Sequence, residues 1–190
     1  MGFKDKFAEF KELSVNKNII LRKANPKKDV DTFFNIYTDS DNFQYYESYT
    51  KPIKDKNVAK IIVENMIRDF EKCYNYIWVI AQKKDDKAIG RIHLFNFSNN
   101  NTCVELGYLL DKKYWNKGII SSCVKTVTDF AFSHFEIKRL FARAAVDNIG
   151  SWKVLEKNEF TREGKMRYSM VCGKNTYDSY MYSKIFTDLK

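Results

Sequence analysis

The sequence predicts a mixed α/β domain in which helices cover both faces of one sheet. Amphipathic helical patterns alternate with short apolar strand patterns, in the order helix, strand, two helices, three strands, helix, strand, helix and two strands. The 190 residues, of which 44% are apolar, suffice for one domain with a substantial core, and the chain shows no internal repeat or linker-like segment. We therefore expect one domain of layered helices and strands.

The first residues of the chain carry a helical spacing of apolar side chains. These side chains recur at steps of three and four residues, which predicts a short amphipathic helix laid on the body of the protein or on a partner. They are Phe3, Phe7, Phe10 and Leu13. We therefore expect an N-terminal helical extension over residues 1–18 and a main domain over residues 19–190.

The next segments build the first half of the main domain. A strand is expected at "IILRKA" from Ile19, and a helix at "DVDTFFNIYTD", opened by Asp29 or Asp31. A second amphipathic helix is marked by an apolar face made of Val58, Ile61, Ile62, Met66, Ile67 and Phe70. The segments "YIWVIAQK" and "AIGRIHLFNF", joined by the turn-like "KDDK", then predict a hairpin.

The second half of the main domain continues this alternation. A strand is expected at "TCVELGYLLD", followed by a helix with one apolar face made of Ile120, Cys123, Val124, Val127 and Phe130 or Ala131. "KRLFARAAV" predicts a further strand, and "DNIGSWKVLEKNEF" predicts a loop and a short helix. "FTREGKMRYSMV" and "TYDSYMYSKIF" predict a closing pair of strands around Gly173.

Charge and cysteine content limit the classes of function. The formal charge of +9 suits anionic ligands, but the basic residues are scattered and mostly lysine, which is typical of a solvated surface and not of a nucleic-acid binder. The four cysteines lie on separate segments without CxxC or CxxH spacing, and His93 and His134 lack a suitably spaced partner, so we expect no disulfide framework and no metal. No run approaches the roughly 18 to 20 apolar residues of a membrane span, and the start lacks a signal-peptide core, so we expect a cytoplasmic protein.

The junction "DKKYWNKGIISSCVK", at residues 111–125, is the first indication of a ligand. It places Gly118 and two small hydroxyl residues at the start of a helix, where backbone N–H groups have no intrahelical acceptor. Those groups and the helix dipole attract an anion, and we expect a phosphate. The alternative is an ordinary helix that begins with glycine.

The order of elements and three segments together resemble the GNAT acyl-CoA N-acyltransferases, and within them the ribosomal-protein N-acetyltransferases. The segments are "VELGYLLDKKYWNKGIISSCVKTV", "ARAAVDNIGSWKVLEKNEF" and "REGKMRYSM" with "YDSYMYSKI". The resemblance runs from about Ile19 onward and is densest from Glu105 to Ser183. It implies acetyl-CoA as co-substrate and a central mixed sheet, mostly antiparallel, that is splayed in the middle.

The resemblance also implies which residues bind CoA. The family's phosphate loop reads Arg/Gln-x-x-Gly-x-Gly/Ala, and its backbone amides would hold the diphosphate here, with Lys117 adding charge and Ser121 a hydroxyl. The backbone of "ELGYLLD" would pair with the pantetheine arm, and Asn148 would bond the pantetheine amide or cap its helix. The expected CoA-binding residues are Tyr108, Leu109, Leu110, Trp115, Asn116, Lys117, Gly118, Ile119, Ile120, Ser121 and Asn148.

Two residues are candidates for proton transfer. Glu105 would take the proton of a substrate ammonium, directly or through a water, because the amine must be neutral to attack a thioester; the alternative is an exposed or salt-bridged strand glutamate. Many relatives carry a helix tyrosine that protonates the leaving thiolate, but the aligned residue here is Leu155. Ser151, one turn earlier on the same helical face, would take that part unless it is a plain helix-start serine.

Three further positions depart from the family's pattern. Ile120 stands where the phosphate loop has a small residue, and Glu159 stands where a glycine usually ends the helix, which predicts a strained residue or a different turn. Met170 stands where some ribosomal-protein acetyltransferases carry a carboxylate. The aromatic segment "FQYYESY", from Phe43 to Tyr49, would wall the acceptor cleft or pack against the sheet.

The sequence therefore predicts an acetyl-CoA-dependent N-acetyltransferase that transfers acetyl directly, in a ternary complex. Catalysis through an acyl-cysteine is less favoured, because no histidine is placed to activate Cys103 or Cys123. The resemblance implies a protein N-terminus, such as that of a ribosomal protein, as acceptor. The alternatives are acetylation of a polyamine or amino sugar, and a noncatalytic CoA-binding regulatory module. We expect a monomer or homodimer, without a membrane or nucleic-acid partner.

Overall fold

An eight-stranded sheet organises the protein. The computed structural model describes residues 2–46, 51–98, 100 and 102–189. The strands are β1 (Leu13–Ser14), β2 (Ile19–Arg22), β3 (Tyr76–Gln82), β4 (Ala88–Phe95), β5 (Cys103–Leu110), β6 (Arg139–Ala145), β7 (Thr161–Cys172) and β8 (Asn175–Ile185). They lie in the order β1-β2-β3-β4-β5-β6-β8-β7, and every neighbouring pair is antiparallel except β5 with β6. The predicted mixed sheet, mostly antiparallel, is confirmed.

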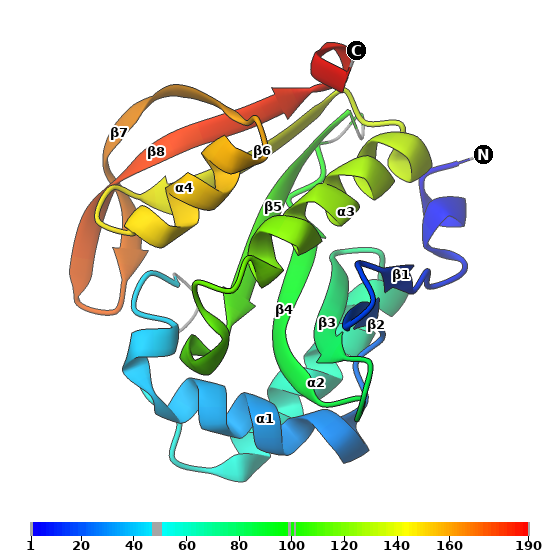
Figure 1. Cartoon of the computed structure of the whole chain (residues 1–190), viewed down its shortest axis with the longest axis vertical. Helices are drawn as coiled ribbons and strands as arrows, with labels where there is room; N and C mark the ends of the chain where they lie inside the picture. Colours follow the sequence, from blue (N-terminus) through cyan, green and yellow to red (C-terminus); the bar gives the residue numbers. More distant parts are fainter. Residues whose placement is uncertain (1, 47–50, 99, 101, 190) are drawn as a thin grey trace.

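Four α-helices cover the two faces of this sheet. They are α1 (Pro26–Thr38), α2 (Lys56–Glu71), α3 (Ile119–Phe135) and α4 (Ile149–Lys157). In Figure 1, α3 crosses in front of the central strands and α2 lies behind them. Apart from Phe70 at the end of α2, the buried apolar side chains of α1 and α2 form one cluster with the sheet, and those of α3 and α4 belong to another on the opposite face. Within the described residues, no helix is long and apolar enough to cross a membrane.

The N-terminal segment corrects one expectation. In place of an amphipathic helix, it forms a single 3-10 turn (Lys4–Phe7) and then the short strand β1. Phe7 is buried and lies 5.4 Å, ring to ring, from both Tyr76 and Phe135. A helix of about a dozen residues is only marginally stable by its own hydrogen bonds, so tertiary packing decided the conformation. The segment docks on its own chain.

The first helix begins earlier than expected. Asn25 accepts a hydrogen bond from the backbone N–H of Lys27 (3.0 Å), and Pro26 occupies the first helical position, where its missing N–H is not needed. Asp29 is not the N-cap residue but lies inside the helix, where its Oδ2 accepts a hydrogen bond from the backbone N–H of Asn25 (2.7 Å). It is fully buried, and its two carboxylate oxygens accept hydrogen bonds from the Arg22 guanidinium at 2.8 and 2.9 Å. That ion pair ties α1 to β2.

The sheet opens in its middle, between β5 and β6. The parallel pairing of these strands covers only residues 103–105, whereas β5 stays paired with β4 up to Leu110 and β6 stays paired with β8 up to Ala145. Figure 1 shows the two strands diverging. The sheet is therefore splayed as expected, and backbone groups on the inner edges of both strands are left for another partner.

Candidate active site

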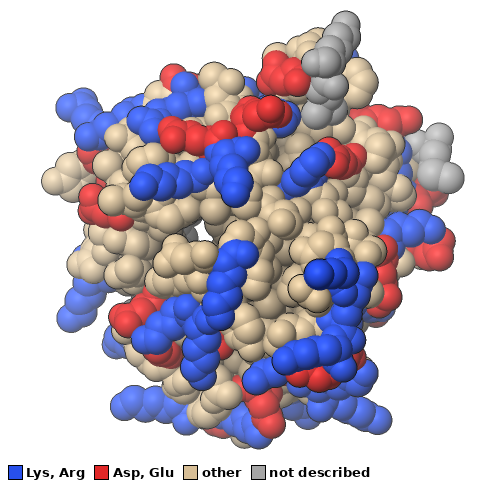
Figure 2. Space-filling model, viewed as in Figure 1, with Lys and Arg blue, Asp and Glu red and all other residues tan. Residues whose placement is uncertain are grey.

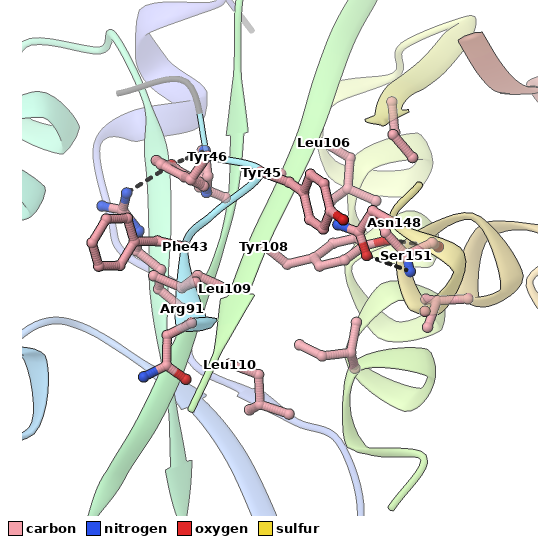
Figure 3. Close-up of a pocket in the computed structure, with 18 of the residues that line it drawn as sticks. Phe43, Tyr45, Tyr46, Arg91, Leu106, Tyr108, Leu109, Leu110, Asn148 and Ser151 are labelled. Carbon is pink, nitrogen blue, oxygen red and sulfur yellow. Dashed lines mark hydrogen bonds between the residues drawn. The ribbon is translucent and has the colours of Figure 1, made fainter. Parts of the chain in front are cut away.

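A cavity of about 800 Å³ lies where β5 and β6 separate. Its lining comes from the second half of β5, the end of β6, the first turns of α3 and α4, and the segment that follows α1 (Figure 3). These parts are far apart in the sequence. The cavity therefore depends on the splay of the sheet and not on any one local motif.

The first turn of α3 forms one end of the cavity. Gly118 precedes the helix with φ +72°, a left-handed conformation that glycine adopts without strain. A Cβ atom placed on Gly118 would meet no atom within 4 Å, so the space beside its Cα is open. The first helical hydrogen bond runs from Ser122 N–H to Gly118 O (3.1 Å). The N–H groups of Ile119, Ile120 and Ser121 precede it, so they have no intrahelical acceptor. This turn has the geometry of an anion site.

The side chains of this turn leave the amides accessible. Ile120 packs against the main apolar cluster, so the larger side chain at this position does not close the loop. The Trp115 indole donates to the carbonyl of Leu110 (2.8 Å), which fixes the loop to β5. Lys117 donates to the carbonyl of Lys113 (2.9 Å) and lies 5.4 Å from the Tyr114 ring centroid. Lys117 therefore lies beside the loop as a cation.

Asn158 is a residue of this end that the sequence did not indicate. It lies at the C-terminal end of α4, and its Nδ2 donates to Ser121 Oγ (3.1 Å) in the first turn of α3. Because the Ser121 oxygen accepts this bond, its own hydroxyl proton remains available to a ligand. No local pattern shows this contact, because 37 residues separate the two side chains.

The inner edge of β5 offers backbone groups to the cavity. The N–H of Asp111, just after β5, donates to the carbonyl of Ile89 on β4 (2.9 Å), so Asp111 faces β4. Along an antiparallel pair, residues whose backbone groups bond the neighbouring strand alternate with residues whose groups point away from it. By that alternation the backbone groups of Leu106, Tyr108 and Leu110 point away from β4. The expectation for Leu109 was wrong, because its backbone faces β4, and the Leu110 carbonyl is already engaged by Trp115. Leu106 and Tyr108 therefore present the accessible edge.

The start of α4 brings Ser151 to the cavity. Asn148 Oδ1 accepts a hydrogen bond from Ser151 N–H (3.2 Å), so the helix-capping role expected for Asn148 is confirmed. The Ser151 hydroxyl lies 2.9 Å from the Tyr108 hydroxyl, and Figure 3 shows the two side chains pointing toward each other. Leu155 is fully buried in the main apolar cluster. The sequence had assigned only the backbone of Tyr108 to the site.

Glu105 lies where the strands part. It is only 4% exposed; Arg143 Nε donates to its Oε1 (3.0 Å) and Asn96 Nδ2 donates to its Oε2 (2.8 Å). The salt-bridged alternative is therefore realised. Each carboxylate oxygen still has a lone pair that can accept a proton through a water, and Glu105 lines the cavity.

The opposite end of the cavity contains a polar cluster on β4. Arg91 donates to the Tyr46 hydroxyl (2.6 Å), which lies 3.4 Å from Nε2 of His93. Burial, and to a smaller extent Arg91, hold the pKa of His93 well below its ordinary value, so the imidazole is neutral. A side chain at Gly107 would collide with this ring, since its Cβ would come within 2.7 Å of Cε1. The ring of His93 is therefore held in place between Gly107 and Tyr46.

Aromatic side chains from the segment after α1 wall this end. Phe43 packs in the apolar cluster of α1 and α2, whereas Tyr45 contacts Tyr177 with ring centroids 5.2 Å apart. Phe43 therefore packs against the sheet as one alternative predicted, Tyr45 lines the cavity, and positions 47–49 of the segment lie outside the described residues. Met170 is buried beside Tyr45 and lines the cavity.

The unusual end of α4 is also explained. Glu159 adopts φ +62°, the left-handed conformation that a glycine would have supplied. Lys184, which is itself buried, donates to Glu159 Oε2 (3.0 Å) and to the carbonyl of Asn158 (3.0 Å). The turn therefore has the left-handed geometry that a glycine would give it. Holding a non-glycine residue in this conformation costs roughly 1 kcal/mol of conformational free energy.

Cys123 is fully buried in the main apolar cluster. Burial raises the pKa of the Cys123 thiol to about 12, which disfavours the reactive thiolate. Within the described part of the chain, no three His, Cys, Asp or Glu side chains gather as a metal site requires.

Figure 2 shows lysines and arginines spread over one face and interleaved with acidic side chains, in agreement with a solvated surface.

Comparisons with known proteins agree with this geometry. Residues 18–161 match the family model described as "Acetyltransferase (GNAT) domain". The "Probable N-acetyltransferase YjcK" of Bacillus subtilis is 32% identical over 148 residues, which is 75% of this chain and 81% of that protein. The "Ribosomal-protein-serine acetyltransferase" of Escherichia coli is 28% identical over 102 residues, 54% of this chain and 57% of that protein.

The fold is shared with solved structures. A structure of "RimL- Ribosomal L7/L12 alpha-N-protein acetyltransferase in complex with Coenzyme A" superposes with a TM-score of 0.81 at 20% sequence identity. The match covers 92% of this chain and 98% of that one.

Proposed function

Because the chain belongs to the GNAT acetyltransferase family and is an N-acetyltransferase of that type, we propose that it transfers acetyl from acetyl-CoA directly to the α-amino group of a protein N-terminus. The observation that carries this proposal is the cavity between β5 and β6, which has an anion site at one end and an aromatic wall at the other. A thioester held between them would meet an amine entering from the aromatic side. Both substrates would then be bound at once.

The residues present fit CoA. The open amides of the first turn of α3, beside Lys117 and Ser121, suit a diphosphate, and the free edge of β5 at Leu106 and Tyr108 suits the amides of a pantetheine arm. Gly118 leaves room for a phosphate where any other residue would place a side chain. Acetyl-CoA supplies the activated acyl group, and the chain supplies the orientation.

Proton transfer is assigned to Glu105 and Ser151. Glu105, through a water, takes the proton of the acceptor ammonium, which frees the nitrogen lone pair for attack on the thioester carbonyl. The carbon–nitrogen bond forms, the oxyanion is met by a backbone N–H of β5, and the carbon–sulfur bond then breaks with its electron pair on sulfur. Ser151 donates its hydroxyl hydrogen bond to that sulfur. Overall the ammonium nitrogen loses two protons, one before the attack and one as the tetrahedral intermediate collapses. The sulfur gains one of them, and the other passes through Glu105 to solvent.

A protein N-terminus is the acceptor best supported. Two of the similar proteins reported above are named for acetylating ribosomal proteins, one at serine and one at an α-amino group. The aromatic wall around Tyr45 suits an extended peptide backbone, and the net charge of +9 opposes the binding of a polycation such as a polyamine.

Thiol release from acetyl-CoA by the purified protein tests the proposal. The acceptors are peptides with the N-terminal sequences of ribosomal proteins, the same peptides already acetylated at the α-amino group, spermidine and an aminoglycoside. We expect turnover with the free peptides alone, and mass spectrometry should place the acetyl group on the α-nitrogen. Turnover with spermidine or the aminoglycoside only, or CoA binding without turnover on any amine, would overturn it.

A further inference from the structure

The side chain of Tyr108 reaches across the cavity to Ser151. Tyr108 lies on β5 and Ser151 on the first turn of α4, 43 residues later. The Tyr108 hydroxyl lies 2.9 Å from Ser151 Oγ and 3.1 Å from the Ser151 carbonyl oxygen. Both residues line the cavity, and Figure 3 shows the phenol directed at the serine.

Hydrogen-bond counting restricts what this contact can be. The phenol has one proton and two neighbouring acceptors, the carbonyl oxygen and the hydroxyl oxygen of Ser151. If the phenol donates to the carbonyl, the serine proton is turned toward the phenol oxygen and away from the cavity. If the phenol donates to Oγ, the serine proton is free to point into the cavity.

The phenol remains a donor across the working pH range. Burial raises the pKa of Tyr108 well above its ordinary value, because the charged phenolate would be poorly solvated there. The Ser151 carbonyl does not depend on the phenol, because it lies in the first turn of α4 and accepts the helical hydrogen bond from the N–H four residues later. The contact with Oγ is therefore free to orient the serine hydroxyl.

We propose that Tyr108 is a positioning residue, whose phenol donates to Ser151 Oγ and so directs the Ser151 hydroxyl at the leaving sulfur. This inference rests on the proposed function. When the carbon–sulfur bond breaks, the electron pair goes to sulfur, which accepts the Ser151 hydrogen bond, and the phenol keeps its own proton throughout. The proton that sulfur gains is one of the two lost by the acceptor ammonium, passed through solvent, and the other is taken up through Glu105.

Tyr108→Phe removes only the hydroxyl and is the first test. We expect kcat to fall about tenfold, the equivalent of one hydrogen bond, while the KM for acetyl-CoA stays within about twofold. Tyr180→Phe is the matched control. Its ring lies outside the cavity and stacks on Arg162 at 4.1 Å, so losing its hydroxyl should leave kcat unchanged. An unchanged kcat in Tyr108→Phe would overturn the proposal.

A double-mutant cycle separates positioning from packing. If the phenol acts through Ser151, Tyr108→Phe should cause no further loss in a Ser151→Ala background. Equal, additive losses in both backgrounds would overturn the proposal and leave Tyr108 a packing residue. If the Tyr108→Phe protein folds poorly, Ser151→Ala is measured alone. Its loss of kcat must then be at least as large as the loss expected for Tyr108→Phe.

Titration of bound CoA gives a readout that needs no amine. CoA labelled at the carbon next to sulfur reports the thiol pKa by nuclear magnetic resonance, and a hydroxyl directed at sulfur should lower that pKa relative to free CoA. Tyr108→Phe and Ser151→Ala should both raise it toward the free value, and Tyr180→Phe should not. If the wild type acetylates no amine, the proposed function alone is overturned. If the thiol pKa of bound CoA is unshifted in the wild type and in every variant, this inference is overturned.

Discussion

Glu105 and Arg143 form a largely buried ion pair at the point where β5 and β6 separate, with Arg143 Nε 3.0 Å from Glu105 Oε1. The glutamate side chain is 6% exposed and that of the arginine 22%. A buried carboxylate without a partner would be strongly destabilising, so the pair allows a charged group to stand beside the substrate cavity. The same carboxylate can serve both the fold and proton transfer.

Glu105→Gln separates these two roles. The amide keeps the size of the side chain but cannot accept a proton, so kcat should fall about 100-fold with little change in the Kd for acetyl-CoA. Steady-state kinetics and calorimetry measure the two quantities. Glu156→Gln is the control, because Glu156 is also ion-paired, to Arg162, and does not line the cavity. A Glu105→Gln protein with full kcat and reduced stability would return Glu105 to a structural role.

Gly118→Asp should abolish CoA binding. The substitution forces a side chain onto a left-handed residue and places a negative charge against the diphosphate, and together these should raise the Kd for CoA more than about 100-fold. Gly164→Asp adds the same charge on β7, where the side chain meets no atom within 4 Å and the backbone is not left-handed. Calorimetry should show unchanged affinity for that control. Normal CoA binding by Gly118→Asp would refute the anion site.

Ser121→Ala should weaken CoA binding by about tenfold. The hydroxyl oriented by Asn158 would be lost, and hydrogen bonds to charged groups contribute about 1.5–3 kcal/mol. Ser133→Ala, later on the same helix, removes a hydroxyl that bonds only the helix's own carbonyls, at Asp129 and Phe130, and should leave the Kd unchanged. Equal affinities for the two variants would exclude Ser121 from the phosphate site.

Acid stability should depend on Glu163. Arg139, together with Ser183, holds the pKa of Glu163 at about 2, below the ordinary value of 4.5. A lowered carboxyl pKa stabilises the fold above pH 4.5, and this contribution is lost as the pH falls from 4.5 toward 2. In urea unfolding, Glu163→Gln should therefore lose stability at pH 7 and lose less at pH 3. The same loss of stability for Glu163→Gln at both pH values would contradict this pH dependence.

Phe7→Ala should destabilise the fold without touching the site. The ring is 4% exposed and packs among the aromatic rings of Phe3, Phe70, Tyr76, Phe97 and Phe135. Its truncation should lower the free energy of unfolding by about 3–5 kcal/mol, whereas Ile61→Ala, at a 53% exposed position, should change it by less than about 1 kcal/mol. A loss as small as that of Ile61→Ala would mean that the N-terminal segment is not held on the body of the protein.

Local patterns predicted the elements well. Each strand and helix expected from Ile19 onward is present, because period two and period 3.6 in apolar side chains report directly which face of an element is buried. Gly118 was also identified correctly as the start of α3, since a glycine before an apolar helical pattern is a local signal. The exceptions are instructive. Asp29 was read as a helix cap because its partner, Arg22, lies on another element, and the N-terminal aromatics were read as a helix because their spacing allows one.

The sequence by itself determined the class of fold, the family resemblance and the position of the glycine that begins α3, all of which depend on neighbours along the chain. Only the tertiary structure decided which backbone groups of β5 face the cavity, that Glu105 is paired with Arg143, and that Tyr108 and Asn158 contact the hydroxyls of Ser151 and Ser121. These contacts join residues 37 or more positions apart. Their distances follow from how the sheet splays and how α3 and α4 pack on it, and no short stretch of sequence carries that information.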